Sequence, residues 1–421
     1  LSSSSAASDV YKRQDIIDRI AIERESFPVI WLSGAARTGK TLILKYLQAN
    51  MNGGQSAFYI DMSDFGEYEL VQSGFVSLIR HLTQKGYKSG ENISLLLDNV
   101  QFSDNLPELL RILLEKEPNI HFILAGTMTD AIQEMLEISL KERYIMLTLL
   151  PYSFREFLRA KEHSDWLEYL PDLPFAISEN PFPESIRDEL QALYEEYLIF
   201  GGYPEIAAIT GYDEKAAWLR KRVSAFVLRE IPSVYQINKR HSFVQFVMQL
   251  ANQQGELYNE AYFSRTLRIK PETLHKWLSI LCDFGIVDIV TPHHQNNANE
   301  LIKMSKIFFL DSGLRNALIN NFSPLNNRND VLGLLEQGVF IALRKYPQWM
   351  IHFWRSKQGQ HIHFILKNDL ELLPIELKAH TRTSAYVQRW SKRNGFYEAY
   401  VINLEGFLQK KELRYLPAYC L

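Results

Sequence analysis

The sequence lacks any apolar run that approaches the roughly 18 consecutive residues needed by a membrane-spanning helix. It contains only two cysteines, Cys282 and Cys420, which argues against a disulfide framework or a thiolate metal cluster and is typical of a reducing cytoplasm. Its net charge is only −3, so no global basic field for nucleic acid exists, although a local basic face stays open. We therefore expect a cytoplasmic protein without a membrane partner.

The composition is that of an ordinary globular protein, with 46% hydrophobic and 23% charged residues in a chain of 421. This length predicts about two to four domains. The first stretch, residues 1–14 (LSSSSAASDVYKRQ), is rich in Ser and Ala, begins without Met and lacks the apolar core of a signal peptide. We interpret residues 1–14 as an artefact or a disordered segment and begin the fold prediction at residue 15.

Residues 15–160 alternate apolar runs with helical patterns, such as those at Thr41–Leu47 and Leu106–Leu114. The apolar runs are nearly continuous, as in strands that are covered on both faces. The predicted strands are 27–34, 56–62, 93–99, 120–126 and 143–149. This alternation predicts an α/β domain built on a mostly parallel sheet.

The remainder of the chain divides into three predicted regions. Residues 161–240 are expected to form a helical linker or lid. Residues 241–320 show the order helix, helix, turn, helix and two strands of a winged helix-turn-helix, with Pro271 at the first position of the second helix of the helix-turn-helix. Residues 325–421 predict a small α/β domain, with one helix followed by an antiparallel three-stranded meander.

The stretch GAARTGKT fits the phosphate-loop pattern G-x-x-x-x-G-K-[ST], and it follows a predicted strand and opens a predicted helix. Glycines let the backbone curl so that its N–H groups point at phosphate oxygens, and the helix N-terminus adds positive potential. Lysine would contact the β- and γ-phosphates, and threonine would bind Mg²⁺. The expected nucleotide contacts are Gly34, Ala35, Ala36, Arg37, Thr38, Gly39, Lys40, Thr41 and, beyond the loop, Asp98.

Two later strand ends supply further candidates. Asp98 closes the run LLLD and is predicted to help Thr41 hold Mg²⁺; the alternative is a buried strand that ends in an Asx turn. Asn99 follows it, and an amide cannot accept a proton at neutral pH, although it can orient water. Thr127 follows the predicted strand 120–126. In the fold implied by the resemblance described next, this strand lies between the strand before the phosphate loop and the strand that ends at Asp98. Thr127 would then contact the γ-phosphate or the attacking water; the alternative is a simple cap.

An ordered set of motifs carries a family resemblance over about residues 15–405. The motifs are GAARTGKT, LLLDNVQ, ILAGTMT, SLKERY, FGGYPE, KIFFLDSGL, GLLEQ, FWRSKQGQ and PIELK. The chain resembles the prokaryotic AAA-type P-loop ATPases that carry a C-terminal domain of unknown function. The resemblance implies a P-loop NTPase domain, a winged helix and a C-terminal restriction-endonuclease-like fold. It also implies that Arg143 senses nucleotide and that Asn99 stands where a catalytic glutamate is expected.

The resemblance further implies a metal site in the C-terminal domain, with Glu336, Glu376 and Lys378 matching family residues. His363 stands where an aspartate is expected, and imidazole is a poor Mg²⁺ ligand. We therefore expect no magnesium-dependent nuclease activity. Glu376 and Lys378, two residues apart on one strand face, would equally form an ion pair. A zinc site from His361, His363 and His352 with Glu376 is a further alternative.

The predicted function is binding of ATP with Mg²⁺, weak hydrolysis at best and a nucleotide-dependent switch. The alternative is a DNA-binding regulator or scaffold in which nucleotide is a structural ligand. The predicted second helix of the winged motif carries His275 and Lys276 beside the acidic Glu272, few cations for a DNA-reading helix. DNA binding and packing between domains both stay open, as does the oligomeric state.

Overall fold

The structure is a computed structural model that describes residues 13–51, 56–103, 105–127, 130–170, 175, 181–293, 304–356, 358–380, 386–396, 398–410 and 413–421. Residues 1–12 of the segment interpreted as an artefact lie outside the described residues. The chain divides into two compact units, one of residues 1–150 with 283–285 and one of residues 151–282 with 286–421. Among the described residues, no helix is long and apolar enough to cross a membrane.

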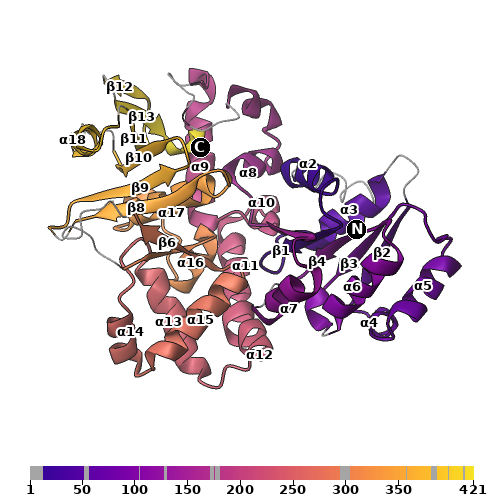
Figure 1. The fold of residues 1–421 in the computed structure, drawn as a ribbon. Helices are drawn as coiled ribbons and strands as arrows, with labels where there is room; N and C mark the ends of the chain where they lie inside the picture. The colour runs from indigo at the N-terminus through magenta and orange to yellow at the C-terminus, as the bar shows by residue number, and fades with distance from the viewer. Residues whose placement is uncertain are drawn as a thin grey trace. The chain divides into compact units, whose positions relative to one another are not determined.

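The first unit contains the five predicted strands, and all of them pair in parallel. Their order in the sheet is β2-β3-β4-β1-β5 (Figure 1). Their bounds are β1 (Val29–Ser33), β2 (Ser56–Asp61), β3 (Ile93–Asp98), β4 (Ile120–Ala125) and β5 (Tyr144–Thr148). The predicted parallel α/β fold is therefore confirmed.

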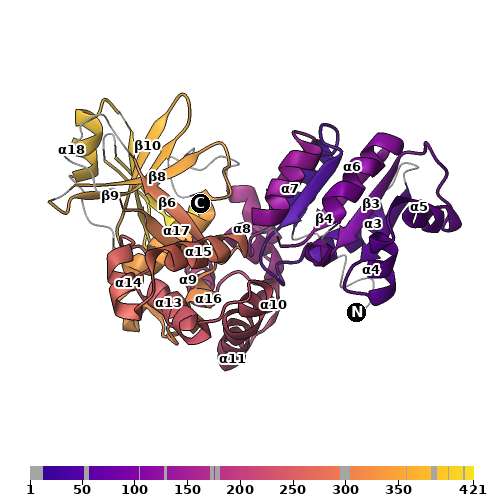
Figure 2. The same ribbon diagram turned by 60° about the horizontal axis from the view of Figure 1, so that its bottom comes forward.

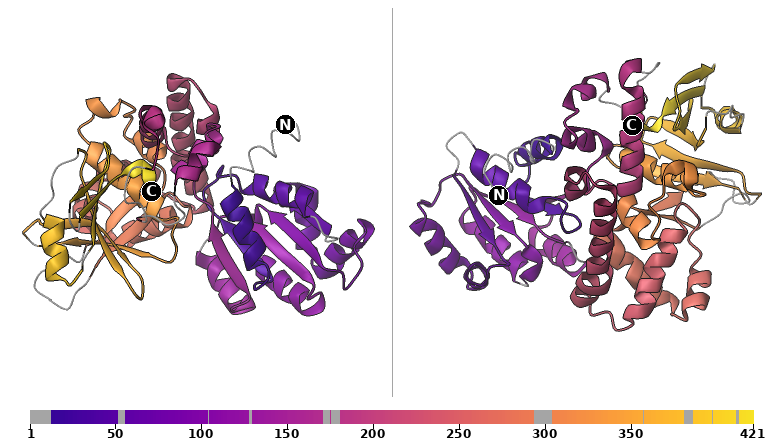
Figure 3. Two further views of the ribbon diagram at one scale, coloured as in Figure 1. Left: turned by 90° about the horizontal axis from the view of Figure 1, so that it is seen from above. Right: turned by 180° about the vertical axis from the view of Figure 1, so that it is seen from behind.

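Helices cover both faces of this sheet because successive side chains of each strand point to opposite faces. Trp31 packs in the core on one face and Leu32 in the core on the other. The first core is closed by α4 (Phe65–Gln72), α5 (Phe75–Gln84), α6 (Leu106–Lys116) and α7 (Asp130–Leu140). The second is closed by α2 (Gln14–Glu23) and α3 (Lys40–Asn50), and Figure 3 shows the helices on the two sides of the sheet.

The second unit begins with helices, as predicted for the region after the first domain. The α-helices of the unit include α8 (Phe154–Ala160), α9 (Glu184–Phe200), α10 (Pro204–Ala208), α11 (Tyr212–Ala225), α13 (Arg240–Asn252), α14 (Glu260–Leu267) and α15 (Pro271–Asp283). Three more lie between or after its first strands: α16 (Ser312–Leu318), α17 (Val331–Leu343) and α18 (Tyr386–Arg393). A single π-helical turn, η3 (Phe226–Glu230), leads from α11 into the short α12 (Ile231–Val234). Pro271 begins α15, in the predicted position.

An eight-stranded sheet closes the second unit, with the order β12-β13-β11-β10-β9-β8-β6-β7. Its strands are β6 (Val287–Pro292), β7 (Lys306–Phe309), β8 (Met350–Arg355), β9 (His361–Lys367), β10 (Leu372–Leu377), β11 (Ala399–Asn403), β12 (Leu408–Lys410) and β13 (Leu413–Pro417). The antiparallel meander β8-β9-β10 is present, and Figure 2 shows these strands side by side.

The same sheet crosses the boundary expected between residues 241–320 and 325–421. The antiparallel strands β6 and β7 follow α13, α14 and α15 in the order of a winged helix. However, β6 also pairs in parallel with β8 through Thr291 with His352 and Pro292 with Phe353. Backbone hydrogen bonding thus joins the two regions into one structural unit, a long-range pairing that local sequence patterns do not encode.

Asp311 ties two distant turns of the second unit together. Its carboxylate caps α16 by accepting from the Leu314 N–H at 2.7 Å, and it accepts from the Gly202 N–H at 2.8 Å. Gly201 has φ +77°, and a Cβ there would lie 2.4 Å from the Asp311 carboxylate. Burial raises the pKa of Asp311 to about 6, against the opposing effect of the backbone N–H donors. The FGGYPE and FFLDSGL motifs are therefore two parts of one contact.

Replacing Asp311 by alanine should destabilise the protein by about 2–4 kcal/mol, because it removes a helix cap and leaves two buried N–H groups without their acceptor. Asn259→Ala is the matched control, since Asn259 caps α14 at an exposed position through Tyr262. It should cost about 1 kcal/mol. Urea unfolding measures both, and equal losses would contradict a special role for Asp311.

The cost of Asp311→Ala should depend on pH. A folded-state pKa of about 6 lies above the ordinary 3.8, so between these values the folded chain holds more protons than the unfolded chain. The stabilisation is present below the unfolded pKa and is lost as pH rises through the folded pKa. We expect the variant to lose more stability at pH 4 than at pH 6.5, by up to about 3 kcal/mol. A loss that grows with rising pH would contradict this sign.

Candidate functional site

The phosphate loop connects β1 to α3, and glycine is required at both of its ends. Gly34 has φ +147°, and a Cβ there would lie 2.3 Å from the Leu149 carbonyl oxygen. Gly39 has φ +100° and immediately precedes the first residue of α3. Neither conformation suits a residue with a side chain. The loop therefore bends tightly over the end of β1 and presents the N-terminus of α3, the local geometry that favours an anion.

Polar side chains hold the loop in this shape. Thr38, which is fully buried, donates its hydroxyl to the Ala35 carbonyl at 2.9 Å. Lys40 donates its ammonium to the Gly34 carbonyl at 2.7 Å and to the Ala35 carbonyl at 2.9 Å. The lysine charge thus already lies within the curl of the loop, where it would meet phosphate oxygens.

Arg13 also holds the loop, although the sequence prediction excluded it with residues 1–14. Its guanidinium donates to the Thr38 carbonyl and to the Leu150 carbonyl, both at 2.9 Å. Arg13 is 5% exposed; its bond to Thr38 is buried and its bond to Leu150 is partly buried. Arg13 immediately precedes α2, so it links the start of this helix to the loop and to the segment after β5. The local sequence YKRQ does not predict these contacts, because the bond to Leu150 spans 137 residues.

Asp98 lies at the carboxyl edge of the sheet, on the second strand from β1. It is 2% exposed. Its Oδ2 accepts from the Tyr59 hydroxyl at 3.0 Å, and its Oδ1 accepts from the Asn99 N–H at 2.9 Å. These bonds fix the carboxylate on the same edge as the loop, where the sequence placed it.

Asn99 follows Asp98 in the left-handed backbone region, with φ +56°, a conformation that Asn tolerates better than most residues. Its side-chain Nδ2 donates to Oδ1 of Asp61 at 2.9 Å. Asp61 ends β2 and lies directly beside Asp98 in the sheet register. The sequence prediction missed Tyr59 and Asp61, although both belong to the apolar run SAFYIDM, whose end a parallel sheet brings to this edge.

Thr127 follows β4, which lies between β1 and β3 as predicted. Its backbone N–H donates to the Gln101 side chain at 3.4 Å, a long contact. A Cβ on Gly126 would lie 2.6 Å from Oε1 of Gln101, so glycine lets this side chain approach the strand end. Gln101 therefore connects the turn after Asp98 to the end of β4. The predicted contact of Thr127 with phosphate or water stays a prediction.

Within one copy of the protein, Arg143 does not lie near these residues. It is exposed and immediately precedes Tyr144, the first residue of β5. The parallel register places Tyr144 beside Val29 and Thr148 beside Ser33. Arg143 therefore lies at the amino edge of the sheet, whereas the loop leaves the carboxyl edge. The sensing role implied by the resemblance would require a second copy of the protein to bring Arg143 to the nucleotide.

The residues at the carboxyl edge fit ATP with Mg²⁺. The loop offers backbone donors at a helix N-terminus, Lys40 offers a cation, and Thr41 and Asp98 offer the oxygens that Mg²⁺ prefers. A bound Mg²⁺ would supply charge neutralisation for the phosphates. All of these groups belong to one unit of the chain.

The two carboxylates proposed as a C-terminal metal site are each paired with a lysine. Glu336 on α17 accepts from Lys306 on β7 at 2.6 Å, and the two side chains are 7% and 6% exposed. Glu376 on β10 pairs with Lys378 at 2.7 Å, the ion pair that the sequence offered as an alternative. Burial raises the pKa of Glu336, against the opposing charge of Lys306. The lysines supply the positive charge that a metal ion would otherwise provide, so the contacts give a magnesium site here no support.

His363 is buried beside these pairs, and its Nδ1 accepts from the Leu377 N–H at 3.2 Å. Burial, followed by the charges of Lys306, His361 and Lys378, holds the pKa of His363 well below its ordinary value. Across the described ranges, no group of three or more His, Cys, Asp or Glu side chains is placed to hold a metal ion. The zinc alternative at His361, His363, His352 and Glu376 is therefore not formed.

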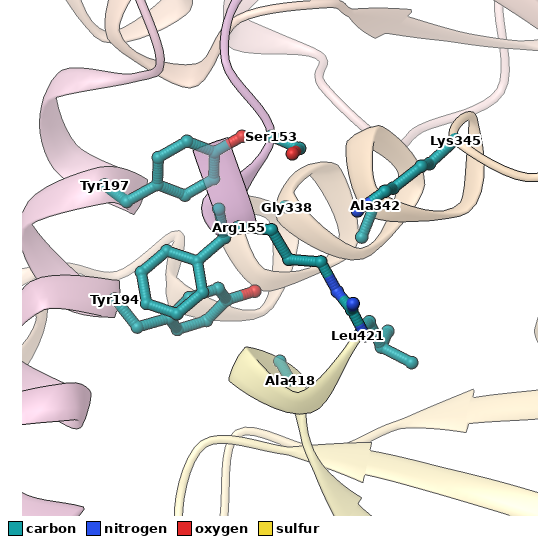
Figure 4. A pocket seen from close by; sticks show the side chains of 10 residues that line it. Ser153, Arg155, Tyr194, Tyr197, Gly338, Ala342, Lys345, Ala418 and Leu421 are labelled. Atoms are coloured by element: carbon teal, nitrogen blue, oxygen red, sulfur yellow. The ribbon is translucent and has the colours of Figure 1, made fainter. Parts of the chain in front are cut away.

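A separate small pocket lies in the second unit and contains none of the predicted site residues. Aromatic side chains of α9, Tyr194 and Tyr197, form one wall, and Arg155 and Lys345 bring positive charge (Figure 4). The Tyr194 hydroxyl is buried, and no residue in the described part of the chain bonds to it. Burial raises the pKa of Tyr194, so the phenol stays protonated. The residues that line this pocket all belong to the second unit.

Comparison with known proteins supports the nucleotide-binding assignment. Residues 26–158 match the family model of an AAA domain, and residues 191–325 match a domain of unknown function, DUF8612. The chain therefore carries an AAA-type P-loop ATPase domain, a class that binds nucleotide. The match of unknown function covers the middle of the chain rather than residues 325–421, where the resemblance had implied such a domain. The winged-helix and endonuclease-like assignments stay predictions.

Relatives that match most of the chain are distant in sequence. An uncharacterized protein of Haemophilus influenzae is 24% identical over 346 residues, covering 78% of this chain and 80% of its own length. An uncharacterized protein of Methanocaldococcus jannaschii is 22% identical over 348 residues, covering 80% and 71%. Among solved structures, a Walker-type ATPase of Pyrococcus abyssi is 14% identical with a TM-score of 0.46, covering 73% of this chain and 95% of that one.

Lys306→Met should destabilise the protein by about 3–5 kcal/mol, because it leaves the Glu336 carboxylate buried without its partner. Arg111→Met is the control, since Arg111 and its partners Glu108 and Glu115 are all exposed, and its effect on stability should be much smaller. Adding Glu336→Gln to Lys306→Met should recover much of the stability. Urea unfolding gives all three values; a double variant no more stable than Lys306→Met would contradict the charge argument.

Proposed function

We propose that the protein binds ATP with Mg²⁺ through Gly34–Thr41 and Asp98, hydrolyses it slowly and uses the bound nucleotide as a switch. The observation that carries the proposal is the loop itself, with Gly34 and Gly39 in conformations that suit glycine and with the Lys40 ammonium inside the curl. The amide of Asn99 beside Asp98 supports slow hydrolysis, because it cannot take the proton of the attacking water.

The contacts of the loop also support a switch. Lys40 must leave the Gly34 and Ala35 carbonyls when it turns toward a phosphate. The Thr38 carbonyl in the same loop accepts from Arg13, whose guanidinium also holds the Leu150 carbonyl. Leu150 is the last residue of the first unit before the chain continues into the second. A change in the loop would thus reach the Leu150 carbonyl, at the end of this stretch of the first unit, through the Arg13 guanidinium.

Lys40→Ala should weaken ATP binding about 30- to 100-fold, because it removes a charge-assisted hydrogen bond to phosphate. Lys85→Ala, an exposed lysine at the end of α5, is the control and should leave the affinity unchanged. Titration with a fluorescent ATP analogue measures both. Wild-type turnover should stay below about 1 s⁻¹. Faster turnover that Lys40→Ala abolishes would contradict slow hydrolysis, and equal affinities in the two variants would contradict binding at the loop.

DNA binding is the second candidate function, and exposed cations around α14 and α15 favour it. Arg265 and Arg268 lie at the end of α14, Lys270 precedes α15, and Lys276 is exposed on α15. His275 on the same face is instead paired with Glu260. Four cations on consecutive turns could contact the phosphate backbone of a duplex, whereas packing between domains requires no such exposed charge.

Arg268→Ala with Lys276→Ala should reduce DNA affinity and lower the slope of log K against log salt by roughly 0.9 for each phosphate that the variant no longer neutralises. Lys367→Ala, at the exposed end of β9, is the control. Fluorescence anisotropy with a duplex at several salt concentrations measures the slope. No binding at near-physiological salt would favour a packing role, and identical affinity with and without ATP would argue against nucleotide control.

A further inference from the structure

The side chain of Asn99 is oriented by a carboxylate on the neighbouring strand. Nδ2 of Asn99 donates to Oδ1 of Asp61 at 2.9 Å. A carboxylate only accepts hydrogen bonds, so it fixes which end of the amide faces β2. The carbonyl end, Oδ1 of Asn99, must then point away from Asp61. Within the described residues, no donor bonds to this oxygen.

Asp61 is itself held firmly. The same Oδ1 accepts from the Ser63 N–H at 2.9 Å and from the Ser63 hydroxyl at 2.7 Å. Burial acts to raise the pKa of Asp61, but the hydrogen bonds from Asn99 and Ser63 and the charge of Lys45 bring it below its ordinary value. Asp61 is therefore a carboxylate, not a neutral acid, at neutral pH, and its preference for the N–H end of the amide is strong.

The helix that carries Thr41 faces this pair. Thr41 and Lys45 are one turn apart on α3 and share a face of the helix. The Lys45 ammonium lies over the Tyr59 ring, 5.6 Å from its centroid. Tyr59 in turn donates to Asp98, which lies beside Asp61 in register. The magnesium-binding face of α3 is thus directed toward the strands that end in Asp98 and Asp61.

We propose that Asp61 is a positioning residue for ATP hydrolysis, which fixes the Asn99 amide so that its Oδ1 accepts a hydrogen bond from the attacking water. The proposal rests on the ATP binding and slow hydrolysis proposed above. In this chain the acid ends β2 and the amide immediately follows β3.

The step balances without a protein base. The water oxygen forms a bond to the γ-phosphorus, and the bond from that phosphorus to the β,γ-bridging oxygen breaks, with its electron pair leaving on ADP. Asn99 orients the water but takes no proton. The proton passes to an oxygen of the released phosphate, and this route is slower than transfer to a carboxylate because general-base assistance is missing.

Exchanging the two residues provides the sharpest test. Asn99→Glu alone places a second carboxylate against Asp61, and like charges at hydrogen-bond distance cannot both ionise freely. Asp61→Asn together with Asn99→Glu restores one carboxylate and one amide, with the carboxylate now immediately after β3, next to Asp98. The introduced asparagine would donate to the introduced glutamate, so the pair keeps its hydrogen bond with the roles exchanged.

The experiment measures kcat and the affinity for ATP in the full chain for Asp61→Asn, Asn99→Glu and the double variant. We expect Asp61→Asn to lower kcat about tenfold with little change in affinity, and Asn99→Glu alone to raise it less than about threefold. The double variant should raise kcat on the order of 100-fold, the usual contribution of a general base. Asp64→Asn, an exposed cap of α4 that accepts from the Gly66 N–H at 2.9 Å, is the matched control and should leave kcat unchanged.

The outcomes separate this inference from the proposed function. If the wild-type protein does not bind ATP, or if Lys40→Ala leaves its turnover unchanged, the proposed function is overturned. If ATP binds but Asn99→Glu alone gains as much as the double variant, the coupling to Asp61 is refuted. If the wild-type rate is too low to detect, the comparison of Asn99→Glu with the double variant decides, because kcat is expected to rise in both. An equal loss in Asp61→Asn and Asp64→Asn would point to a structural effect alone.

Discussion

The parallel register of the first sheet is the constraint on which the candidate site depends. Hydrogen bonds between neighbouring strands align Leu32, Ala125, Asp98 and Asp61 in one row across four strands. Every parallel strand ends at the same edge, so residues that immediately follow this row meet there. A slip of one residue in any strand would turn its last polar side chain to the other face. The tight turn at Gly34, held against the Leu149 carbonyl, is possible because the register fixes both strands.

In the second unit, buried charged side chains need partners, and these partners connect distant parts of the unit. Lys306 neutralises Glu336 inside the unit, and Asp311 satisfies backbone donors from two distant turns. Carboxylates in these positions would be unfavourable without such partners. In the pattern that resembles a metal site, Glu336 and Glu376 are each paired with a lysine, and the Glu336–Lys306 pair joins α17 to the eight-stranded sheet. Buried charge is thus weak evidence for chemistry unless the partner groups are identified.

Much of the first unit could be predicted from sequence because its signals are local. Five apolar runs, one glycine-containing loop and an aspartate at a strand end are visible from residue order alone. Residues whose roles depend on partners far along the chain were missed. Arg13 contacts the loop across 25 residues, and Asp61 meets Asn99 across 38. For Arg143 the motif match gave no location, and the register of β5 places it at the amino edge of the sheet, so its sensing role stays a prediction.

The sequence by itself determined the phosphate loop, the alternation of strands and helices, and the replacement of the expected glutamate by Asn99, because each depends on residue type and short spacing. Only the tertiary structure decided which carboxylate faces Asn99, that Lys306 neutralises Glu336, and that β6 and β8 join two expected domains in one sheet. Those facts depend on which helices and strands become neighbours, and this is decided by the packing of the whole chain rather than by any short stretch of it.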